Sequence, residues 1–470
     1  MEENILKSIS INKVESKENS ENSLIHRLSY FITTEKGEGE LWFEVEREFA
    51  HSLAEDRCDS AVVALLPLAI KEGYAAIHST VPISQDLYFN LTRNVIPQLC
   101  LANGSKTPSL EIKAPITDNL FQGKGVACGM SLGIDSFATL AEFGRESELK
   151  PYQITHLTYF NVGAHHGYDW RLGKSELTSR ELYEGQLLKV RSFARENDYP
   201  LIIIDSNLAI FLSKFMGKSQ FYMTHTYRNI ASAMILQRII GRYHYSAAYN
   251  IDRFAVNLDG DSGSYEKWLL PNLSTGSIEF FSANRAWSRF DKTKMVVELE
   301  SSHNYLTVCF LGIDNCGECD KCRKTLMTID VMGEDALSKF RNSFNLPKYK
   351  DSFREMLFQS IYAQMKRKGV YGSDMKDIFD HALATNFPYL VEPDLASMRP
   401  GQEYAVIRKN IAAFRPFPST NSARKKTLIQ GDLLKCLGRF GDWIKVSDGT
   451  DEGYVNLIGV ELIDHKPTKN

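Results

Sequence analysis

The sequence predicts an α/β protein in which a parallel sheet flanked by helices is preceded by a small α/β unit and followed by a small β-barrel. Between residues 126 and 256, short apolar runs alternate with helical patterns, which is typical of strands joined by helices in a parallel sheet. After Pro400 the pattern changes to short strands separated by Gly and Asp turns, which indicates an all-β domain. The chain of 470 residues has room for about three domains.

Four segments follow from these patterns: 1–120, 121–345, 346–398 and 399–470. In the first, residues 1–23 are polar and we expect them to be frayed, whereas the later residues predict strands at Leu28–Thr33 and Leu41–Val45 and a helix at Asp59–Glu72. In the second, strands and helices are predicted in turn at Val126–Met130, Phe137–Glu142, Ile154–Phe160, Glu181–Glu196, Leu201–Ile204, Arg228–Gly241 and Phe254–Val256. The third is predicted to be helical. The fourth has short predicted strands at Tyr404–Arg408, Leu433–Gly438, Trp443–Val446 and Gly453–Val455.

Composition excludes several classes of protein. Hydrophobic residues make up 43% and charged residues 24%, which is the profile of a globular chain and not of a disordered one. The net charge of −3 gives no bulk electrostatic reason to bind nucleic acid or a membrane surface. The apolar stretch at Ala61–Ile70 is too short to span a bilayer and is interrupted by Pro67. The N-terminus has no secretory pattern, so we expect a cytoplasmic protein.

The first predicted strand of the 121–345 segment runs directly into Ser131-Leu132-Gly133-Ile134-Asp135-Ser136, where a helical pattern begins. A tight turn between a strand and a helix can bind phosphate, because the free N–H groups and the dipole of the helix start favour an anion. Ser131 and Ser136 can add hydroxyl donors, and Asp135 can cap the helix and lie near Mg2+. The segment is also compatible with an ordinary N-capped helix.

This segment resembles the S-G-G-x-D-S signature of the PP-loop ATP pyrophosphatases. The resemblance implies that Ser131, Gly133, Asp135 and Ser136 bind ATP, and that AMP is transferred to a substrate oxygen with release of pyrophosphate. Leu132 departs from the signature, which usually has Gly there. A side chain at this position can narrow the pyrophosphate cradle.

Further segments resemble 7-cyano-7-deazaguanine synthase, a PP-loop enzyme, in the same chain order. They are Gly163-Ala164-His165-His166 for its G-Q-R-H segment, Thr226-Tyr227-Arg228-Asn229 for its G-R-N element, and Asp261-Ser262-Gly263-Ser264-Tyr265 for its D-x-S-G-Y substrate loop, in a rearranged order. The Pro-Asp-Cys-Arg that follows in the family is absent. Ser288, Arg289 and Lys292 resemble the basic residues that precede the family's metal site. Taken alone, His166 is also typical of a structural histidine and Arg228 of a surface ion pair.

Four of the eight cysteines fall within fourteen residues: Cys309, Cys316, Cys319 and Cys322. Two overlapping C-x-x-C turns, with Gly317 in the first, suit a tetrahedral Zn2+ site, and a strand at Leu306–Val308 would present Cys309. An iron–sulfur cluster of the ferredoxin type is the alternative, but that run needs a further Cys where Leu326 stands. Four protein ligands leave no open position, so we expect a structural metal. The same cysteine arrangement closes the fold in the 7-cyano-7-deazaguanine synthases.

Taken together, these resemblances imply a parallel sheet of the PP-loop (Rossmann-like) type with a zinc knuckle. They imply an ATP-dependent ligase or synthetase that uses ATP, Mg2+ and Zn2+ and adenylates a carboxylate of a nucleobase-like substrate of the 7-deazaguanine type. An amide or nitrile, or conjugation to an amine, would follow. Asp135, His166, Arg228 and Lys292 would serve catalysis, and Arg228 and Arg289 would contact the nucleotide. Such relatives occur in anti-phage defence gene clusters and beside surface-polysaccharide genes.

The C-terminal segment resembles the bacterial Src-homology-three-like domain at Gly441-Asp442-Trp443-Ile444-Lys445-Val446 and Gly453-Tyr454-Val455. Trp443 and Tyr454 would line a groove for a protein partner, or they pack the core of the barrel. Two alternatives to the synthetase remain open. One is a degenerate PP-loop protein that only binds nucleotide or a partner. The other is a sulfur-transfer enzyme acting on tRNA, which would need a free catalytic C-x-x-C and a basic RNA-binding face.

Overall fold

The computed structural model describes residues 7–105, 110–164, 178–216, 221–309, 311–354, 377–378, 381, 397–415, 424–440 and 442–465. The chain divides into two compact units. The larger unit comprises Met1–Cys322 and Lys339–Phe344, and the smaller unit comprises Arg323–Ser338 and Asn345–Asn470.

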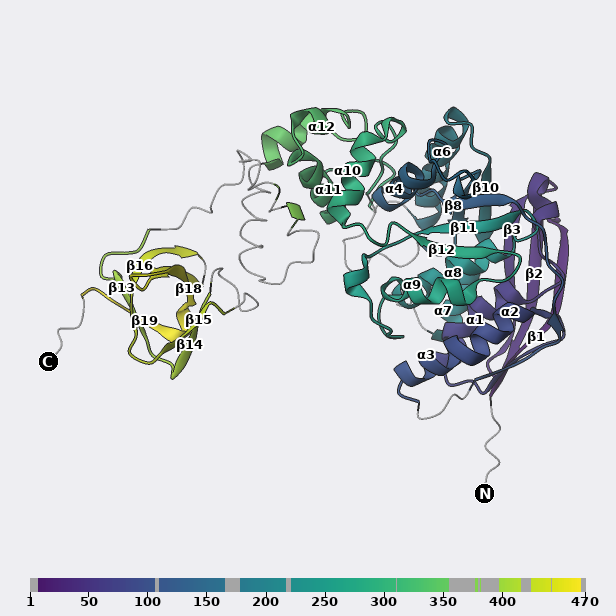
Figure 1. The fold of residues 1–470 in the computed structure, drawn as a ribbon, viewed down its shortest axis with the longest axis horizontal. Coiled ribbons are helices and arrows are strands. Elements are labelled where there is room, and N and C mark those ends of the chain that lie inside the picture. The colour runs from purple at the N-terminus through teal and green to yellow at the C-terminus, as the bar shows by residue number, and fades with distance from the viewer. Residues whose placement is uncertain are drawn as a thin grey trace, which may run out of the picture. The chain divides into compact units, whose positions relative to one another are not determined.

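A single ten-stranded sheet forms the centre of the larger unit (Figure 1). In chain order its strands are β1 (Ser8–Glu18), β2 (Ile25–Thr34), β3 (Gly37–Glu46), β4 (Ala76–Ser79), β6 (Glu111–Lys113), β8 (Gly125–Gly129), β9 (His156–Asn161), β10 (Leu201–Ser206), β11 (Ile240–Ser246) and β12 (Glu279–Ala283). They lie side by side in the order β12-β11-β8-β9-β10-β3-β2-β1-β4-β6. The first five of this order pair in parallel, as do β1, β4 and β6, and the antiparallel pairs of β3 with β10, of β3 with β2 and of β2 with β1 join the two parts. A separate two-stranded pair joins β5 (Ile83–Ser84) to β7 (Ile116–Thr117).

Helices cover both faces of the parallel part of the sheet, with α4 and α6 on one face and α1, α7 and α8 on the other (Figure 1). The helices of the larger unit are α1 (Asp59–Lys71), α2 (Gln85–Asn90), α3 (Ile96–Ala102), α4 (Ile134–Phe143), α6 (Ser179–Glu196), α7 (Leu208–Met216), α8 (Phe221–Met234), α9 (Glu266–Leu273) and α10 (Arg289–Glu298), and α11 (Asp320–Asp330) begins in the larger unit and continues in the smaller one. Because side chains alternate along a strand, Ile202 and Ile204 of β10 pack in the core that contains α1 and α8. On the other face, the rings of Phe137 and Phe193 lie 5.3 Å apart and join α4 to α6.

The expectation that residues 1–23 are frayed is wrong for Ser8–Glu18, which form β1 and pair with β2 on one side and β4 on the other. Only Ile9 and Ile11 of this strand are fully buried, and most of its other side chains are polar, so the sequence pattern did not indicate a strand. The strands of the 1–120 segment continue the sheet of the 121–345 segment, because Val45 of β3 pairs with Ile204 of β10.

Three further predicted elements differ from the structure. The segment Phe254–Val256 is not a strand but follows a 3₁₀ turn, and Phe254 is 47% exposed. The helix predicted at Arg228–Gly241 ends at Met234, and β11 begins at Ile240. The segment Leu306–Val308 has no strand partner among the described residues. Short apolar runs do not by themselves distinguish a strand from a buried helix end or an ordered loop.

The smaller unit contains a separate antiparallel sheet of five strands in the order β18-β17-β16-β13-β19 and the pair β14-β15. Their bounds are β13 (Tyr404–Ile407), β14 (Ile411–Phe414), β15 (Lys426–Ile429), β16 (Leu433–Phe440), β17 (Trp443–Ser447), β18 (Glu452–Asn456) and β19 (Val460–Ile463). The four strands predicted here are confirmed as β13, β16, β17 and β18. Tyr454 is 2% exposed and packs inside, so it does not line an open groove, whereas Trp443 is half-buried.

The remaining elements of the smaller unit are α12 (Glu334–Ser338) and α13 (Leu346–Lys348), and most of the helical segment predicted at 346–398 lies outside the described residues. Across the described part of the chain, no helix combines the length and the apolar composition that a membrane crossing requires.

We predict that a chain ending at Ser397 keeps the fold of the larger unit. The C-terminal strands enclose a hydrophobic core of their own, which includes Ile407, Phe414, Ile444 and Val455, so the larger unit does not need them for its core. Calorimetry should show the high-enthalpy transition of the larger unit unchanged after truncation. Aggregation of the shortened chain, or a large loss of its melting temperature, would contradict this prediction.

Candidate functional site

The loop that follows β8 has the strand–turn–helix geometry expected of a phosphate-binding segment. Gly133 is the N-cap residue of α4, and Ser136 Oγ, in the first turn, donates to the Gly133 carbonyl at 3.0 Å. Ser131 Oγ lies 3.4 Å from Ser136 Oγ, so both hydroxyls are gathered at the helix start. Asp135 does not cap the helix as predicted, because no side chain caps α4 and the Asp135 carboxylate contacts two cations instead.

Helix α10 brings the two predicted cations to this loop. Arg289 Nη1 lies 2.8 Å from one carboxylate oxygen of Asp135, and Lys292 Nζ lies 3.1 Å from the other. Burial opposes ionisation of Asp135, but the charges of Arg289 and Lys292 outweigh it and lower the pKa of Asp135 to about 2. Lys292 is buried and also donates to the Ala247 carbonyl at 2.6 Å, directly after β11. The structure therefore brings Asp135 together with two cations of α10 that lie more than 150 residues away in the sequence.

Leu132, the departure from the PP-loop signature, adopts a left-handed backbone conformation with φ 59°. A branched side chain is strained in this region by about 1–2 kcal/mol, which explains why glycine suits the position. The Leu132 side chain is fully buried, so it lies within the protein and not in an open cradle. Its carbonyl accepts a hydrogen bond from the Thr307 N–H at 2.8 Å, which fixes the loop from the side of the cysteine cluster.

Arg228 lies on α8 and approaches the loop that follows β9. Its Nη1 donates to the Val162 carbonyl at 3.1 Å, and Nε, which is enclosed, has no hydrogen-bond partner among the described residues. Burial lowers the pKa of Arg228 to about 10, so the guanidinium stays charged at neutral pH. Gly163 has φ 112°, and a Cβ there would lie 2.3 Å from Arg228 Nη1, so only glycine allows this approach. His166 lies outside the described residues.

The Asp261–Tyr265 segment is held against the N-terminal half of α8, in part by two residues that the sequence analysis did not identify, His225 and Tyr249. His225 Nε2 lies 2.6 Å from Asp261 Oδ1, and the Tyr249 hydroxyl donates to Asp261 Oδ2 at 2.9 Å. The Thr226 N–H donates to Ser262 Oγ at 3.2 Å. Neither His225 nor Tyr249 belongs to a local motif, so only the tertiary structure brings them to Asp261.

A polar network that joins α4 to two strands was also not predicted from the sequence. The Thr139 hydroxyl lies 2.8 Å from Ser246 Oγ, at the end of β11, and 2.8 Å from Asn284 Oδ1, directly after β12. Asn284 has φ 56°, a conformation in which Asn is several-fold enriched among non-glycine residues. This network ties the middle of α4 to the carboxyl ends of β11 and β12. An Asn directly after a strand was the sequence signal available for it.

The four clustered cysteines form a candidate metal site. Their Sγ atoms all lie within 4.8 Å of one another, and the pairs Cys309–Cys319 and Cys316–Cys322 lie 4.0 Å apart. A tetrahedral Zn2+ with bonds of about 2.3 Å places its sulfurs about 3.8 Å apart, so the cluster fits zinc with little adjustment. Gly317 in the first turn has φ 75°, as the tight turn requires. The described residues show this one group of metal-ligating side chains.

Asn315 organises the backbone around the cluster. Its Oδ1 accepts from the N–H groups of Val308 and Cys309 at 2.8 and 3.2 Å, and its Nδ2 donates to the Leu306 carbonyl at 2.7 Å. These bonds replace the strand that the sequence predicted at 306–308. Thr307 lies between Leu306 and Val308, and its backbone N–H donates to the Leu132 carbonyl. The cysteine cluster and the candidate phosphate loop are therefore directly connected.

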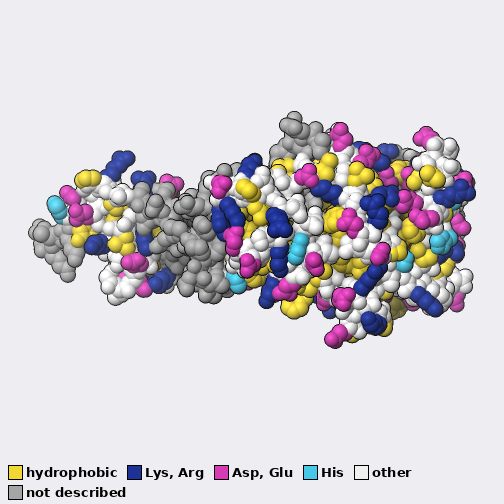
Figure 2. Space-filling view, turned by 90° about the horizontal axis from the view of Figure 1, so that it is seen from above, with side chains coloured by type: hydrophobic (Ala, Val, Ile, Leu, Met, Phe, Trp, Pro, Cys, Tyr) yellow, Lys and Arg dark blue, Asp and Glu magenta, His cyan; other side chains and the backbone are white. Residues whose placement is uncertain are grey.

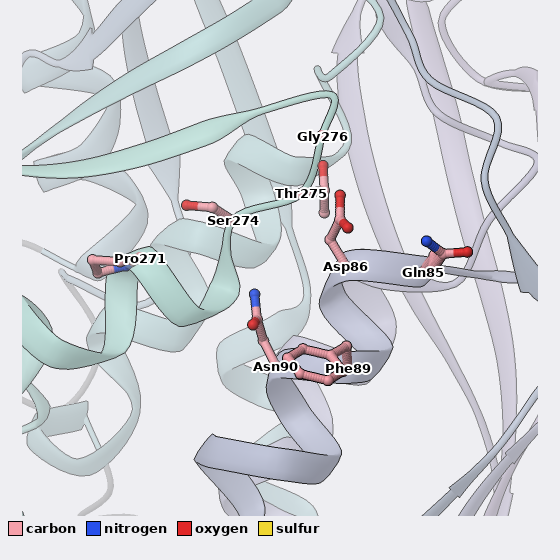
Figure 3. Close-up of a pocket in the computed structure, with 8 residues that line it drawn as sticks. All are labelled: Gln85, Asp86, Phe89, Asn90, Pro271, Ser274, Thr275 and Gly276. Carbon is pink, nitrogen blue, oxygen red and sulfur yellow. The ribbon is translucent and has the colours of Figure 1, made fainter.

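A pocket of about 520 Å³ lies between α2 and the end of α9 (Figure 3). Asp86, Phe89 and Asn90 line one side, and Pro271, Ser274 and Thr275 line the other. Thr275 precedes β12, whereas the candidate phosphate loop follows β8, which runs parallel to β11 and β12. The pocket therefore lies at the opposite edge of the sheet and does not belong to the candidate site.

On the face of the larger unit shown in Figure 2, Lys and Arg side chains are interspersed with Asp and Glu side chains. No continuous basic surface is visible among the described residues of that face, in keeping with the net charge of −3. Comparisons with known proteins add nothing to this description, because no protein-family model, curated protein or solved structure matches the chain.

We predict that the purified protein holds one zinc ion per chain and that Cys319→Ser loses it. Cys319 contacts Cys309 across the cluster, and binding energy at such a site becomes folding energy. Metal analysis checks the stoichiometry, and Cys436→Ser, which alters a buried cysteine outside the cluster, is the matched control. Chelation should also speed hydrogen exchange at the Thr307 amide, since that N–H is held next to the metal site. Bound iron, or full zinc retention by Cys319→Ser, would contradict the assignment.

Proposed function

We propose that this protein is an ATP-dependent synthetase of the PP-loop type that adenylates a carboxylate of a nucleobase-like substrate and releases pyrophosphate. The observation that carries the proposal is the arrangement around α4: a hydroxyl-bearing turn after a parallel strand, with Arg289 and Lys292 converging on the first turn of the helix. A helix start supplemented by two cations suits a triphosphate. The resemblance to 7-cyano-7-deazaguanine synthase supports a substrate of the 7-deazaguanine type.

The ion pairs of Asp135 suggest how the charges are used. Arg289 and Lys292 now share one carboxylate, and an incoming triphosphate offers them several anionic oxygens in its place. Asp135 would then be released to hold the Mg2+ that accompanies ATP, since hard cations take carboxylate ligands. The α-phosphorus would stay open to attack by the substrate carboxylate, while preorganised positive charge stabilises the phosphates.

Arg228 supplies a further cation at the same edge of the sheet. One of its N–H groups is held by the Val162 carbonyl, and its enclosed Nε is unpartnered among the described residues, so it can donate to a bound anion. We assign His166 the positioning of the substrate or the uptake of a proton from the incoming amine, by resemblance alone. The four-cysteine site would hold a structural Zn2+ that keeps Leu132 and its loop in place.

A binding-only protein is the second candidate, and two observations favour it. Leu132 stands where the signature has Gly, and Asp135 neutralises the two nearest cations. The hypothesis of a sulfur-transfer enzyme has less support. Both C-x-x-C turns lie within the four-cysteine cluster, where a bound metal would occupy the thiols that catalysis needs. For the synthetase, we propose that the smaller unit, which contains the C-terminal strands, recruits a protein partner. An amine of that partner is one candidate for the final acceptor of the activated acid.

We predict that ATP is converted to AMP and pyrophosphate only in the presence of an acid such as 7-carboxy-7-deazaguanine. Arg289→Gln should raise the KM for ATP by about tenfold, because it removes one charged hydrogen bond to the phosphates. Lys294→Met, which removes an exposed lysine from the same helix, is the matched control. Labelled ATP and separation of the nucleotides measure the reaction. Formation of ADP, or ATP binding without any turnover, would favour the binding-only candidate.

We predict that Leu132→Gly retains ATP binding while lowering thermal stability. Glycine relieves the strained backbone, but removal of a fully buried leucine side chain costs about 2–5 kcal/mol, which is the larger effect. Calorimetric titration with ATP and a melting curve measure both quantities. A marked gain in ATP affinity would show that the side chain does narrow the phosphate cradle.

A further inference from the structure

Helix α9 begins with two adjacent ionisable residues, Glu266 and Lys267, that are both buried. Glu266 Oε1 accepts a hydrogen bond from Ser282 Oγ at 3.0 Å. Glu266 Oε2 and Lys267 Nζ are enclosed and have no hydrogen-bond partner within the described ranges. Enclosing an ammonium without a partner opposes folding, since the group has lost its water and gained no acceptor.

Glu266 balances the charge of its neighbour only to the extent that it is ionised. Burial raises the pKa of Glu266 to about 8, so this carboxyl is largely protonated at neutral pH. Lys292 and Arg285 lie close enough to Lys267 to add positive charge, and the negative groups that act on it are Glu266, where ionised, and the more weakly acting Asp252. Asp252 and Arg285 belong to exposed segments, so the cluster faces the surface loops and not the apolar core. With Glu266 protonated, Lys292 and Arg285 outnumber Asp252, so positive charge predominates around the Lys267 ammonium.

This cluster adjoins the candidate phosphate site through two residues that follow β11. The Ala247 carbonyl accepts from Lys292, and the Ala248 backbone hydrogen-bonds to the Glu266 carboxyl. Ser282, the other partner of Glu266, is the penultimate residue of β12. The start of α9 and the Lys292–Asp135 ion pair are thus attached to the same carboxyl edge of the sheet.

We propose that Lys267 is an anion-binding residue of this site and that its ammonium holds the carboxylate of the acid substrate. The inference rests on the proposed function. Arg289 and Lys292 already supply cations beside α4, where the phosphates would bind, whereas Lys267 approaches from α9, directly after the Asp261–Tyr265 segment. A carboxylate and a phosphate offer an ammonium the same acceptor oxygens, so the experiment must separate them.

The test compares the full-length parent with Lys267→Met, which keeps the side-chain length and removes the charge. Lys294→Met is the control for loss of a lysine, and Lys267→Arg restores a cation. Calorimetric titration uses two separate probes, 7-carboxy-7-deazaguanine alone and inorganic pyrophosphate alone, and melting curves are recorded without ligand. We expect Lys267→Met to lose at least about tenfold in affinity for the acid and less than about twofold for pyrophosphate. Without ligand it should melt at the same or a higher temperature, because an unpartnered buried charge is gone.

Each other outcome overturns a defined part of the inference. Loss of pyrophosphate binding in place of acid binding assigns Lys267 to the nucleotide and overturns the carboxylate assignment. A parent that binds both probes, with an unchanged Lys267→Met, overturns the role of Lys267 and leaves the proposed function intact. A lower melting temperature of ligand-free Lys267→Met identifies a structural lysine and overturns its role in binding. A parent that binds neither probe overturns the proposed function together with this inference.

Discussion

The parallel pairing of β9, β8, β11 and β12 is the constraint on which the candidate site depends. Strands that run in the same direction end at the same edge of a sheet, so the segments that follow them become neighbours wherever they lie in the sequence. Ser131–Gly133 follows β8, Val162 follows β9, Ala247 follows β11 and Asn284 follows β12. Each of these segments carries or holds a residue of the site. Any change of strand order would separate them even if every helix and strand were kept.

Sequence reasoning succeeded where the information is local and failed where it depends on distant partners. The strand before Ser131, the helix after it and the four cysteines have signatures within a few residues, and the structure bears out the strand, the helix and the gathering of the four thiols. Strand β1 was missed because only Ile9 and Ile11 are fully buried in it, and a mostly polar strand is recognisable only beside its neighbours β2 and β4. No local sequence pattern marks Lys267, because the burial of its side chain is decided by the tertiary structure.

In the candidate site, two cations share one carboxylate. Asp135 holds Arg289 and Lys292 in the protein as described, so two cations that would otherwise repel each other are kept at the start of α4. A site built only of cations would be unstable without its anion, and a site with fully satisfied cations would bind none. A single carboxylate shared by two cations lies between these limits. Arg228 Nε and Lys267 Nζ, by contrast, have no hydrogen-bond partner in the part of the chain that the structure describes, so they are costly to bury, and such costs are typically found at functional sites.

The cysteine cluster connects folding to the candidate chemistry through very few bonds. Asn315 fixes Val308 and Cys309 beside the thiols, and Thr307, one residue earlier, donates to the Leu132 carbonyl. Leu132 needs such support because its backbone conformation is unfavourable for a residue with a side chain. The strained conformation of Leu132 in the candidate phosphate loop is therefore supported by a segment that Asn315 holds beside the thiols. A glycine at position 132 would need less of this support, because it adopts the same backbone conformation without strain.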